Sequence, residues 1–119
     1  MNRQINIPDL KTKIVLSDIK YVIKKHPQFS IILKPLTLDT ATPLFIDAIK
    51  LFKSGCLSSD ELSTIGNYLF TFATKFPKSD LFQATLAAGE LAFYIRYHTS
   101  RLRTFLQILD EFYEKYKNL

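Results

Sequence analysis

The chain has few of the residues that build disulfides, metal sites or sharp turns. Among its 119 residues are one cysteine, no tryptophan, 3 glycines and 5 prolines. A single cysteine excludes an intrachain disulfide and a zinc site made of several cysteines. No uninterrupted apolar run reaches the roughly 20 residues that a transmembrane helix needs, and the first residues show no apolar leader. We therefore expect a cytoplasmic protein that does not act in a membrane.

Catalytic and cofactor motifs are also missing. The sequence contains no HxxxH or HExxH pair, no phosphate-binding loop and no GxSxG nucleophile motif. It therefore predicts no metal, cofactor or small-molecule site, and it favours a protein that is not an enzyme. One enzymatic alternative stays open, a small ribonuclease-like helical protein that uses His98, because tyrosines and arginines lie near this histidine in the sequence.

Apolar residues are abundant and recur with helical spacing. Hydrophobic residues make up 47% of the chain and aromatic residues 13%, which at this length favours one folded domain spanning residues 1–119 over a disordered chain. We predict an all-α fold, a single-domain compact bundle of about five helices. Residues 1–7 are expected to form a loose N-terminal arm. The last helix should end near Lys117, and the pattern leaves open whether residues 97–100 interrupt it.

The first helix is predicted to run from Pro8 to Lys25. Proline is well tolerated in the first turn of a helix, because its missing N–H has no partner there in any case. Pro27 disfavours helical geometry at His26, so the helix should stop just before it. The FSIIL stretch at residues 29–33 is too short to assign by its period. We expect it to be a brief helical turn or an extended connector.

Capping residues mark the next two helices. Thr42 and Pro43 are typical of an N-cap and a first helical residue, and Gly55 is placed to close that helix in the left-handed conformation. Ser58 is followed three residues later by Glu61, which is the pattern of a capping box. A short turn should therefore separate two successive helices.

Residues 81–96, LFQATLAAGELAFYIR, are apolar nearly all round. A helix of this kind is typically buried on most sides, so we predict that it is the central helix around which the bundle forms. Small side chains recur every four residues within it, at Ala84, Ala88 and Ala92. This ridge predicts a place where another backbone comes close.

Positive charge belongs to the first half of the chain. Residues 1–59 hold nine Lys or Arg against four Asp or Glu, whereas residues 60–119 hold seven of each. Lys13, Lys20 and Lys24 form a stripe on the first predicted helix. This stripe predicts a surface for phosphates or for an acidic protein; alternatively, the lysines only keep an exposed helix face soluble. A basic helical adaptor that binds nucleic-acid backbone is therefore our second functional hypothesis.

The helices at 43–54 and 58–76 superficially resemble a helix-turn-helix. In that motif the second helix enters the DNA major groove with basic or amide side chains. Here its first turn holds Asp60 and Glu61, and its only cation is Lys75 at the far end. Carboxylates facing a polyanion would be repelled, so a sequence-specific DNA reader is not expected.

Tyrosines and arginines gather near the end of the central helix. Tyrosine and arginine are frequent interface anchors, which favours a protein that works by presenting a surface. Alternatively, some of the tyrosines lie at the edge of the core with only the hydroxyl in water. The predicted partner-binding residues in this region are Tyr94, Tyr97, His98, Arg101 and Arg103.

The junction LFKSGCLSSDEL, from Leu51 to Leu62, resembles the helix–turn–helix junction of small helical bacterial immunity proteins. These proteins belong to colicin-type and contact-dependent growth inhibition toxin systems. The resemblance implies a non-catalytic immunity or antitoxin-like protein that binds and neutralises a cognate protein toxin and needs no cofactor. It further implies that the basic face meets an acidic toxin surface, or that the aromatic residues cover or flank the toxin's active site.

Overall fold

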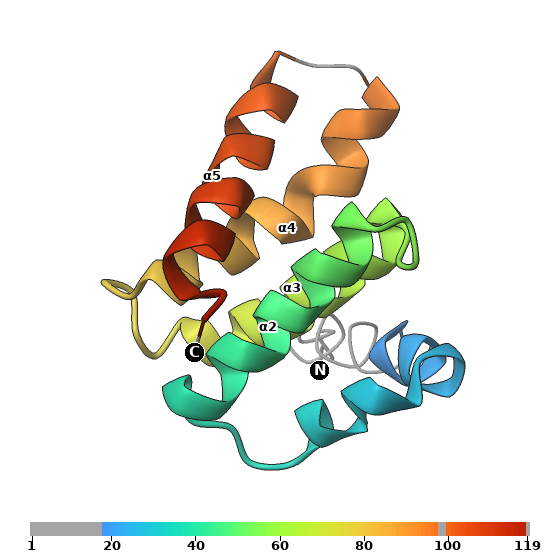
Figure 1. The fold of residues 1–119 in the computed structure, drawn as a ribbon, viewed down its shortest axis with the longest axis vertical. Coiled ribbons are helices and arrows are strands. Elements are labelled where there is room, and N and C mark those ends of the chain that lie inside the picture. The colour runs from blue at the N-terminus through green and yellow to red at the C-terminus, as the bar shows by residue number, and fades with distance from the viewer. Residues whose placement is uncertain (1–17, 98–99, 119) are drawn as a thin grey trace, which may run out of the picture.

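The computed structural model describes residues 18–97 and 100–118, which are helical almost throughout (Figure 1). A helix covers residues 18–25, and one 3₁₀-helix and four α-helices follow it. Their bounds are η1 Pro27–Leu33, α2 Leu38–Lys53, α3 Ser59–Ala73, α4 Asp80–Tyr97 and α5 Arg101–Tyr116. No strand occurs within these ranges, so the all-α prediction is confirmed. The expected N-terminal arm and the start of the first helix lie outside the described residues.

The helices are arranged around the pair formed by α3 and α4. These two helices make the most extensive contact, α4 also packs against α5, and α2 lies against both α3 and α5. α4 and α5 form an antiparallel hairpin that extends beyond the rest of the bundle (Figure 1). α4 ends at Tyr97 and α5 begins at Arg101, so these are two separate helices and not one continuous helix. None of the helices in the described ranges is both long and apolar enough to cross a membrane.

α2 begins one turn earlier than the sequence analysis predicted. Leu38 is its first residue, and Pro43 lies inside the helix. The N-cap is Thr37, whose Oγ1 accepts a hydrogen bond from the backbone N–H of Thr40 at 3.2 Å, while Thr40 Oγ1 accepts one from the backbone N–H of Thr37 at 2.9 Å. This threonine pair satisfies the helix start, so the prediction of Thr42 as the N-cap is wrong. Pro43 costs the first turns one backbone hydrogen bond.

Most of the other predicted boundaries agree with the structure, but α3 ends at Ala73, three residues before the predicted end at residue 76. The first helix ends at Lys25, and the FSIIL stretch lies in η1, so the helical alternative holds. Gly55 has φ 83°, the left-handed conformation expected after α2. Ser58 Oγ accepts from the backbone N–H of Glu61 at 3.0 Å, and Glu61 Oε1 accepts from the backbone N–H of Ser58 at 2.9 Å. The capping box of α3 is therefore confirmed.

α3 and α4 cross at close range through small residues. A Cβ placed on Gly66 would lie 2.7 Å from Ala88 Cβ and 2.9 Å from the backbone nitrogen of Gly89. Beside this point, the buried Ser63 hydroxyl donates to the Ala88 carbonyl at 2.8 Å and accepts from the Ala92 N–H at 3.0 Å. The predicted close approach of another backbone to the small residues of α4 is therefore confirmed at Ala88 and Gly89, whereas Ala84 lines a hollow between α4 and α5.

The Ser63 hydrogen bonds lie beside a change in the direction of α4. The Ala88 carbonyl and the Ala92 N–H are the two partners of one i to i+4 hydrogen bond in a regular helix. A side chain that enters such a pair is a recognised cause of helix bending. Figure 1 shows α4 changing direction at about its middle, so that its second half runs away from α3 toward α5.

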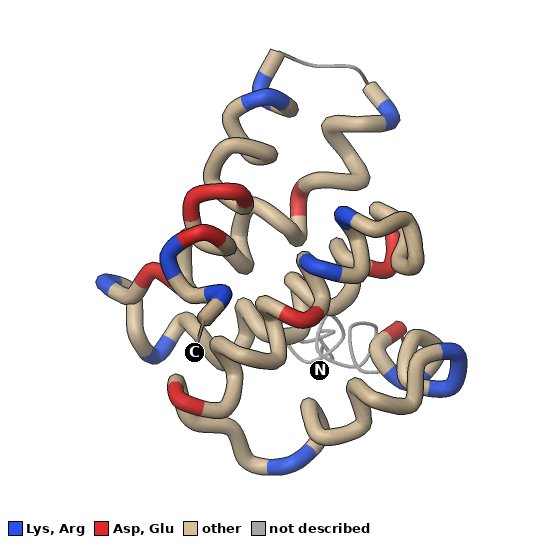
Figure 2. Tube along the Cα trace, viewed as in Figure 1, with Lys and Arg blue, Asp and Glu red and all other residues tan. Residues whose placement is uncertain are grey.

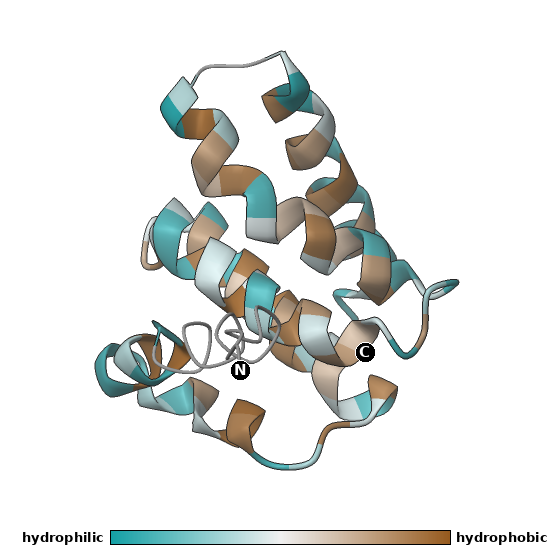
Figure 3. Ribbon diagram, turned by 180° about the vertical axis from the view of Figure 1, so that it is seen from behind, coloured by the Kyte–Doolittle hydropathy of each residue, from teal (hydrophilic) through white to brown (hydrophobic). Residues whose placement is uncertain are grey.

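α4 is buried along only part of its length. Its fully buried residues are Leu81, Ala84, Thr85, Ala87, Ala88 and Leu91. Beyond them, Phe93 and Tyr97 have 56% and 59% of their surface exposed, although hydrophobic residues continue toward the end of the helix (Figure 3). The expectation of a helix buried on most sides is therefore wrong for the last turns, because the hairpin extends past the other helices there.

Glu61 joins the end of the first helix to the start of α3. Its Oε2 lies 3.3 Å from Lys25 Nζ and 3.2 Å from His26 Nε2, and its side chain is 13% exposed. Burial raises the pKa of this carboxyl, but hydrogen bonds from the Ser58 backbone N–H, Lys25, His26 and the Ser58 hydroxyl together lower its pKa to about 2. The carboxylate therefore stays ionised through most of the acidic range.

The close crossing predicts that one methyl group added at Gly66 destabilises the fold. The Cβ of Gly66→Ala would push α3 away from Ala88 and the α4 backbone, and overpacking of this kind typically lowers the unfolding free energy by about 1–3 kcal/mol. Urea denaturation of the wild type and the variant measures the difference. Thr71→Ala, on the exposed side of the same helix, is the control and should stay within about 0.5 kcal/mol of the wild type. Equal stability of Gly66→Ala and the wild type would contradict the crossing.

The Glu61 cluster predicts a stability loss in acid. A carboxyl whose pKa is lowered by folding stabilises the protein above its unfolded pKa, near 4.5, and loses that contribution as the pH falls toward 2. Glu61→Gln keeps the capping-box geometry but removes the charge. We expect the variant to be less stable than the wild type at pH 6, on the order of 1–3 kcal/mol, with the difference shrinking to near zero at pH 2. If the wild type and the variant differ in unfolding free energy by the same amount from pH 6 to pH 2, the charge of Glu61 is not the source of the stability lost in acid.

Candidate functional site

A row of four aromatic rings crosses the far end of the α4–α5 hairpin. Tyr94 of α4 packs against Phe105 of α5 with ring centroids 4.8 Å apart, and both rings are half-buried. Phe93 continues the row, with its centroid 5.2 Å from that of Tyr94 and 4.7 Å from that of Tyr97. The inner pair thus joins the two helices, while Phe93 and Tyr97 present a joint apolar surface to solvent.

Exposed arginines flank this row. Arg96 follows Phe93 by three residues on α4, and Arg101 precedes Phe105 by four on α5, so each lies next to a ring on its own helix surface. Between Leu91 and Leu109 the sequence has three arginines and no Asp or Glu. In Figure 2 the facing ends of α4 and α5 carry only basic charge, and the acidic residues of both helices lie further from this end. We call the surface made by Phe93, Tyr94, Arg96, Tyr97, Arg101 and Phe105 the hairpin tip.

The structure brings together part of the predicted site. Tyr94, Tyr97 and Arg101 all belong to the hairpin tip. Arg103 is exposed at the same end, but it lies two residues from Arg101 and so about 200° around α5. There it lines a shallow hollow of about 410 Å³ on the outer side of that helix, together with residues such as Leu106.

The remaining predicted residues lie elsewhere. Lys20 and Lys24 are exposed on the helix of residues 18–25, which lies at the opposite end of the molecule from the hairpin tip (Figure 2). His98 and Lys13 fall outside the described residues. The lysine stripe and the tyrosine–arginine group are therefore two separate surfaces, not one continuous basic face.

The sequence prediction missed Phe93 and Arg96 as surface residues. Phe93 lies in residues 81–96, the helix expected to be buried on most sides, yet it is 56% exposed. Its spacing carried a signal, because Phe93 lies four residues before Tyr97 and two after the buried Leu91. On a helix these offsets place Phe93 beside the tyrosine and away from the buried side.

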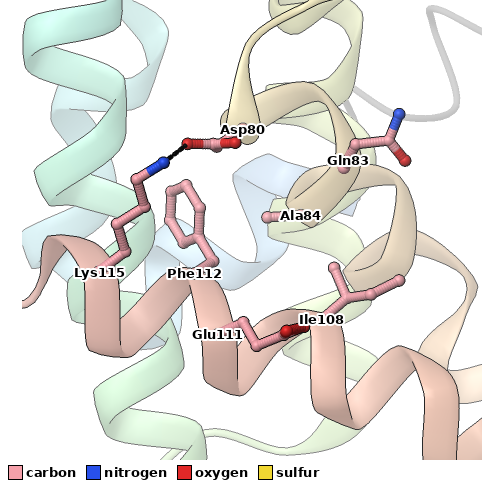
Figure 4. A pocket seen from close by; sticks show the side chains of 7 residues that line it. All are labelled: Asp80, Gln83, Ala84, Ile108, Glu111, Phe112 and Lys115. Carbon is pink, nitrogen blue, oxygen red and sulfur yellow. Dashed lines mark hydrogen bonds and ion pairs between the residues drawn. The ribbon is translucent and has the colours of Figure 1, made fainter.

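A second polar cluster closes the other end of the hairpin. Asp80 Oδ2, at the start of α4, accepts hydrogen bonds from Lys115 Nζ at 2.7 Å and from the hydroxyl of Tyr116 near the end of α5. These hydrogen bonds hold the pKa of Asp80 below its usual value. Figure 4 shows the adjoining hollow of about 250 Å³, which lies between the two helices and has Phe112 in its wall. The cluster ties the base of the hairpin together.

Within 18–97 and 100–118, no three His, Cys, Asp or Glu side chains gather in an arrangement that could hold a metal ion. Cys56 is a free, exposed thiol in the turn after α2. In the described part of the chain, the hairpin tip is the surface that combines exposed aromatic rings with exposed arginines.

Comparison with known proteins gives no functional lead. No protein-family model matches the chain, and neither the curated proteins nor the solved structures contain a significant match. Function is therefore inferred from the geometry and chemistry of the surface.

Proposed function

We propose that this chain is a non-catalytic binding protein of the bacterial cytoplasm, an immunity or antitoxin-like protein that binds and neutralises a cognate toxin domain. The observation that carries the proposal is the pair of exposed rings at the hairpin tip. Phe93 and Tyr97 are each more than half exposed in the free chain. An aromatic side chain carries roughly 150–250 Å² of surface, so a partner that covers the exposed part gains about 2–3 kcal/mol per ring.

The hairpin tip is well prepared for binding. Both exposed rings lie on α4, and the contact between Tyr94 and Phe105 holds α4 against α5. Ser63 anchors α4 to α3 below the tip. A surface that is already ordered loses little conformational entropy when a partner docks. Arginines beside aromatic anchors are, moreover, the composition of interface hot spots.

The segment that resembles immunity proteins plays a different part. Leu51 to Leu62 spans the last turn of α2, the Gly55 turn and the first turn of α3. Its Leu57 and Leu62 are buried in the core. This junction therefore supports the fold, and the proposed toxin contact lies on the α4–α5 hairpin instead.

The proposal predicts that aromatic truncation at the tip weakens toxin binding. Phe93→Ala and Tyr97→Ala should each cost about 2 kcal/mol of binding free energy, roughly a thirtyfold rise in Kd, because they remove the anchor surface. The partner to test is the product of the reading frame next to this gene, with calorimetry for Kd and growth rescue for neutralisation. Tyr21→Ala is the matched control, because Tyr21 is 72% exposed and lies on the distant helix of residues 18–25.

Two results would count against the proposal. If the neighbouring product neither binds the chain nor is neutralised by it, the immunity function is rejected. If it binds but Phe93→Ala and Tyr97→Ala leave Kd unchanged, the hairpin tip is not the contact surface.

A further inference from the structure

The first turn of α5 carries positive charge where a helix ordinarily favours negative charge. The free N–H groups at a helix N-terminus carry partial positive charge, so carboxylates stabilise that end and cations do not. Here the first turn holds Arg101 and Arg103 and no acidic residue, and Ser100 makes no side-chain capping hydrogen bond. By contrast, α2 and α3 both begin with a capping box and an acidic first turn.

This arrangement adds to the charge at the hairpin tip. The arginine side chains and the free N–H groups at the start of α5 all contribute positive charge, and they do so beside rings that are exposed. From this we infer that the hairpin tip binds an acidic protein surface, in which carboxylates surround an apolar hollow that receives Phe93 and Tyr97. The inference rests on the proposed function, since it names the chemistry of the toxin surface that the tip would cover. Arginine suits that role because its guanidinium pairs with carboxylates in a fixed geometry.

The packing of the rings favours a protein over a nucleic acid. Proteins that bind single strands offer successive, separate ring faces on which bases stack, along a basic groove that follows the backbone. At the hairpin tip, Phe93 and Tyr97 lie against each other, with centroids 4.7 Å apart and planes tilted by 48°. They therefore form one apolar knob. The exposed lysines Lys20 and Lys24 lie too far away to extend a phosphate-binding track from it.

Glu90 provides a test of the sign of the partner's charge. It is half-buried on α4, three residues before Phe93 and four before Tyr94, so it borders the aromatic row. A carboxylate at this edge repels an acidic partner and attracts a basic one. Neutralising it should therefore strengthen binding to an acidic surface.

The experiment compares matched charge changes on the folded full-length chain. We expect Arg96→Glu and Arg101→Glu to raise the Kd for the neighbouring gene product about tenfold or more, mainly by slowing association, while Lys24→Glu, with the same charge change at the distant helix, stays within about twofold. Glu90→Gln should lower Kd several-fold. The wild-type association rate should fall as salt rises from 50 to 500 mM. Circular dichroism verifies that each variant is folded.

Defined probes test the same inference without the toxin. Poly-L-glutamate, poly(U) RNA and phosphatidylglycerol vesicles are titrated separately at low salt while amide NMR signals are followed. The inference expects poly-L-glutamate to shift signals of the hairpin tip in the wild type and not in Arg96→Glu/Arg101→Glu. Stronger tip shifts with poly(U) or with vesicles would overturn it in favour of a nucleic acid or a membrane surface.

The outcomes separate the inference from the proposed function. If charge reversal and salt leave the affinity for the neighbouring product unchanged while Phe93→Ala and Tyr97→Ala still weaken it, the acidic-surface inference fails and the proposed function stands. If the neighbouring product does not bind but poly-L-glutamate shifts the tip in an arginine-dependent way, the immunity function fails and the tip's preference for acidic chains stands.

Discussion

The close crossing of α3 and α4 is the constraint on which the rest of the fold depends. Gly66 has no side chain, so the two backbones meet, and this distance allows the Ser63 hydroxyl to reach both the carbonyl of Ala88 and the N–H of Ala92. α4 bends beside this contact, so that its second half leads away from α3 with α5 packed against it (Figure 1). The crossing thus fixes where the projecting hairpin leaves the rest of the bundle.

The bend also divides α4 into two chemically different halves. Before it, small residues such as Ala84 and Ala88 suit a close helix contact, where larger side chains would push the backbones apart. After it, large aromatic residues occupy a region with one neighbouring helix, so two of them stay in water. Keeping Phe93 and Tyr97 exposed forgoes the stabilisation that burial would supply. The partner proposed for the hairpin tip would cover both rings and recover part of that stabilisation.

Local signals in the sequence predicted local structure well. Gly55 and the Ser58–Glu61 box mark boundaries through their own backbone geometry, which no distant contact needs to complete. The prediction that α2 begins at Thr42–Pro43 was wrong because Thr37 and Thr40 form an equally good cap about one turn earlier. The earlier start makes the helix longer, and the added helical hydrogen bonds favour it. The burial of α4 could not be predicted in full, because apolar composition does not show how far the neighbouring helices reach.

The candidate site was predicted in part, and for a reason that was only half correct. Tyr94, Tyr97 and Arg101 were grouped by spacing along the sequence, yet Arg101 belongs to a second helix, α5, which packs against the helix that carries the tyrosines. Residues that are close in sequence stay at the same end of the hairpin, but their spacing decides which face of the helix each one occupies. Arg103, two residues after Arg101, therefore lies on another face of α5. The lysines at the opposite end contribute to the net charge of +5, but they lie away from the exposed rings (Figure 2). The arginines beside Phe93 and Tyr97 are the cations that would act directly on a partner docked at the hairpin tip.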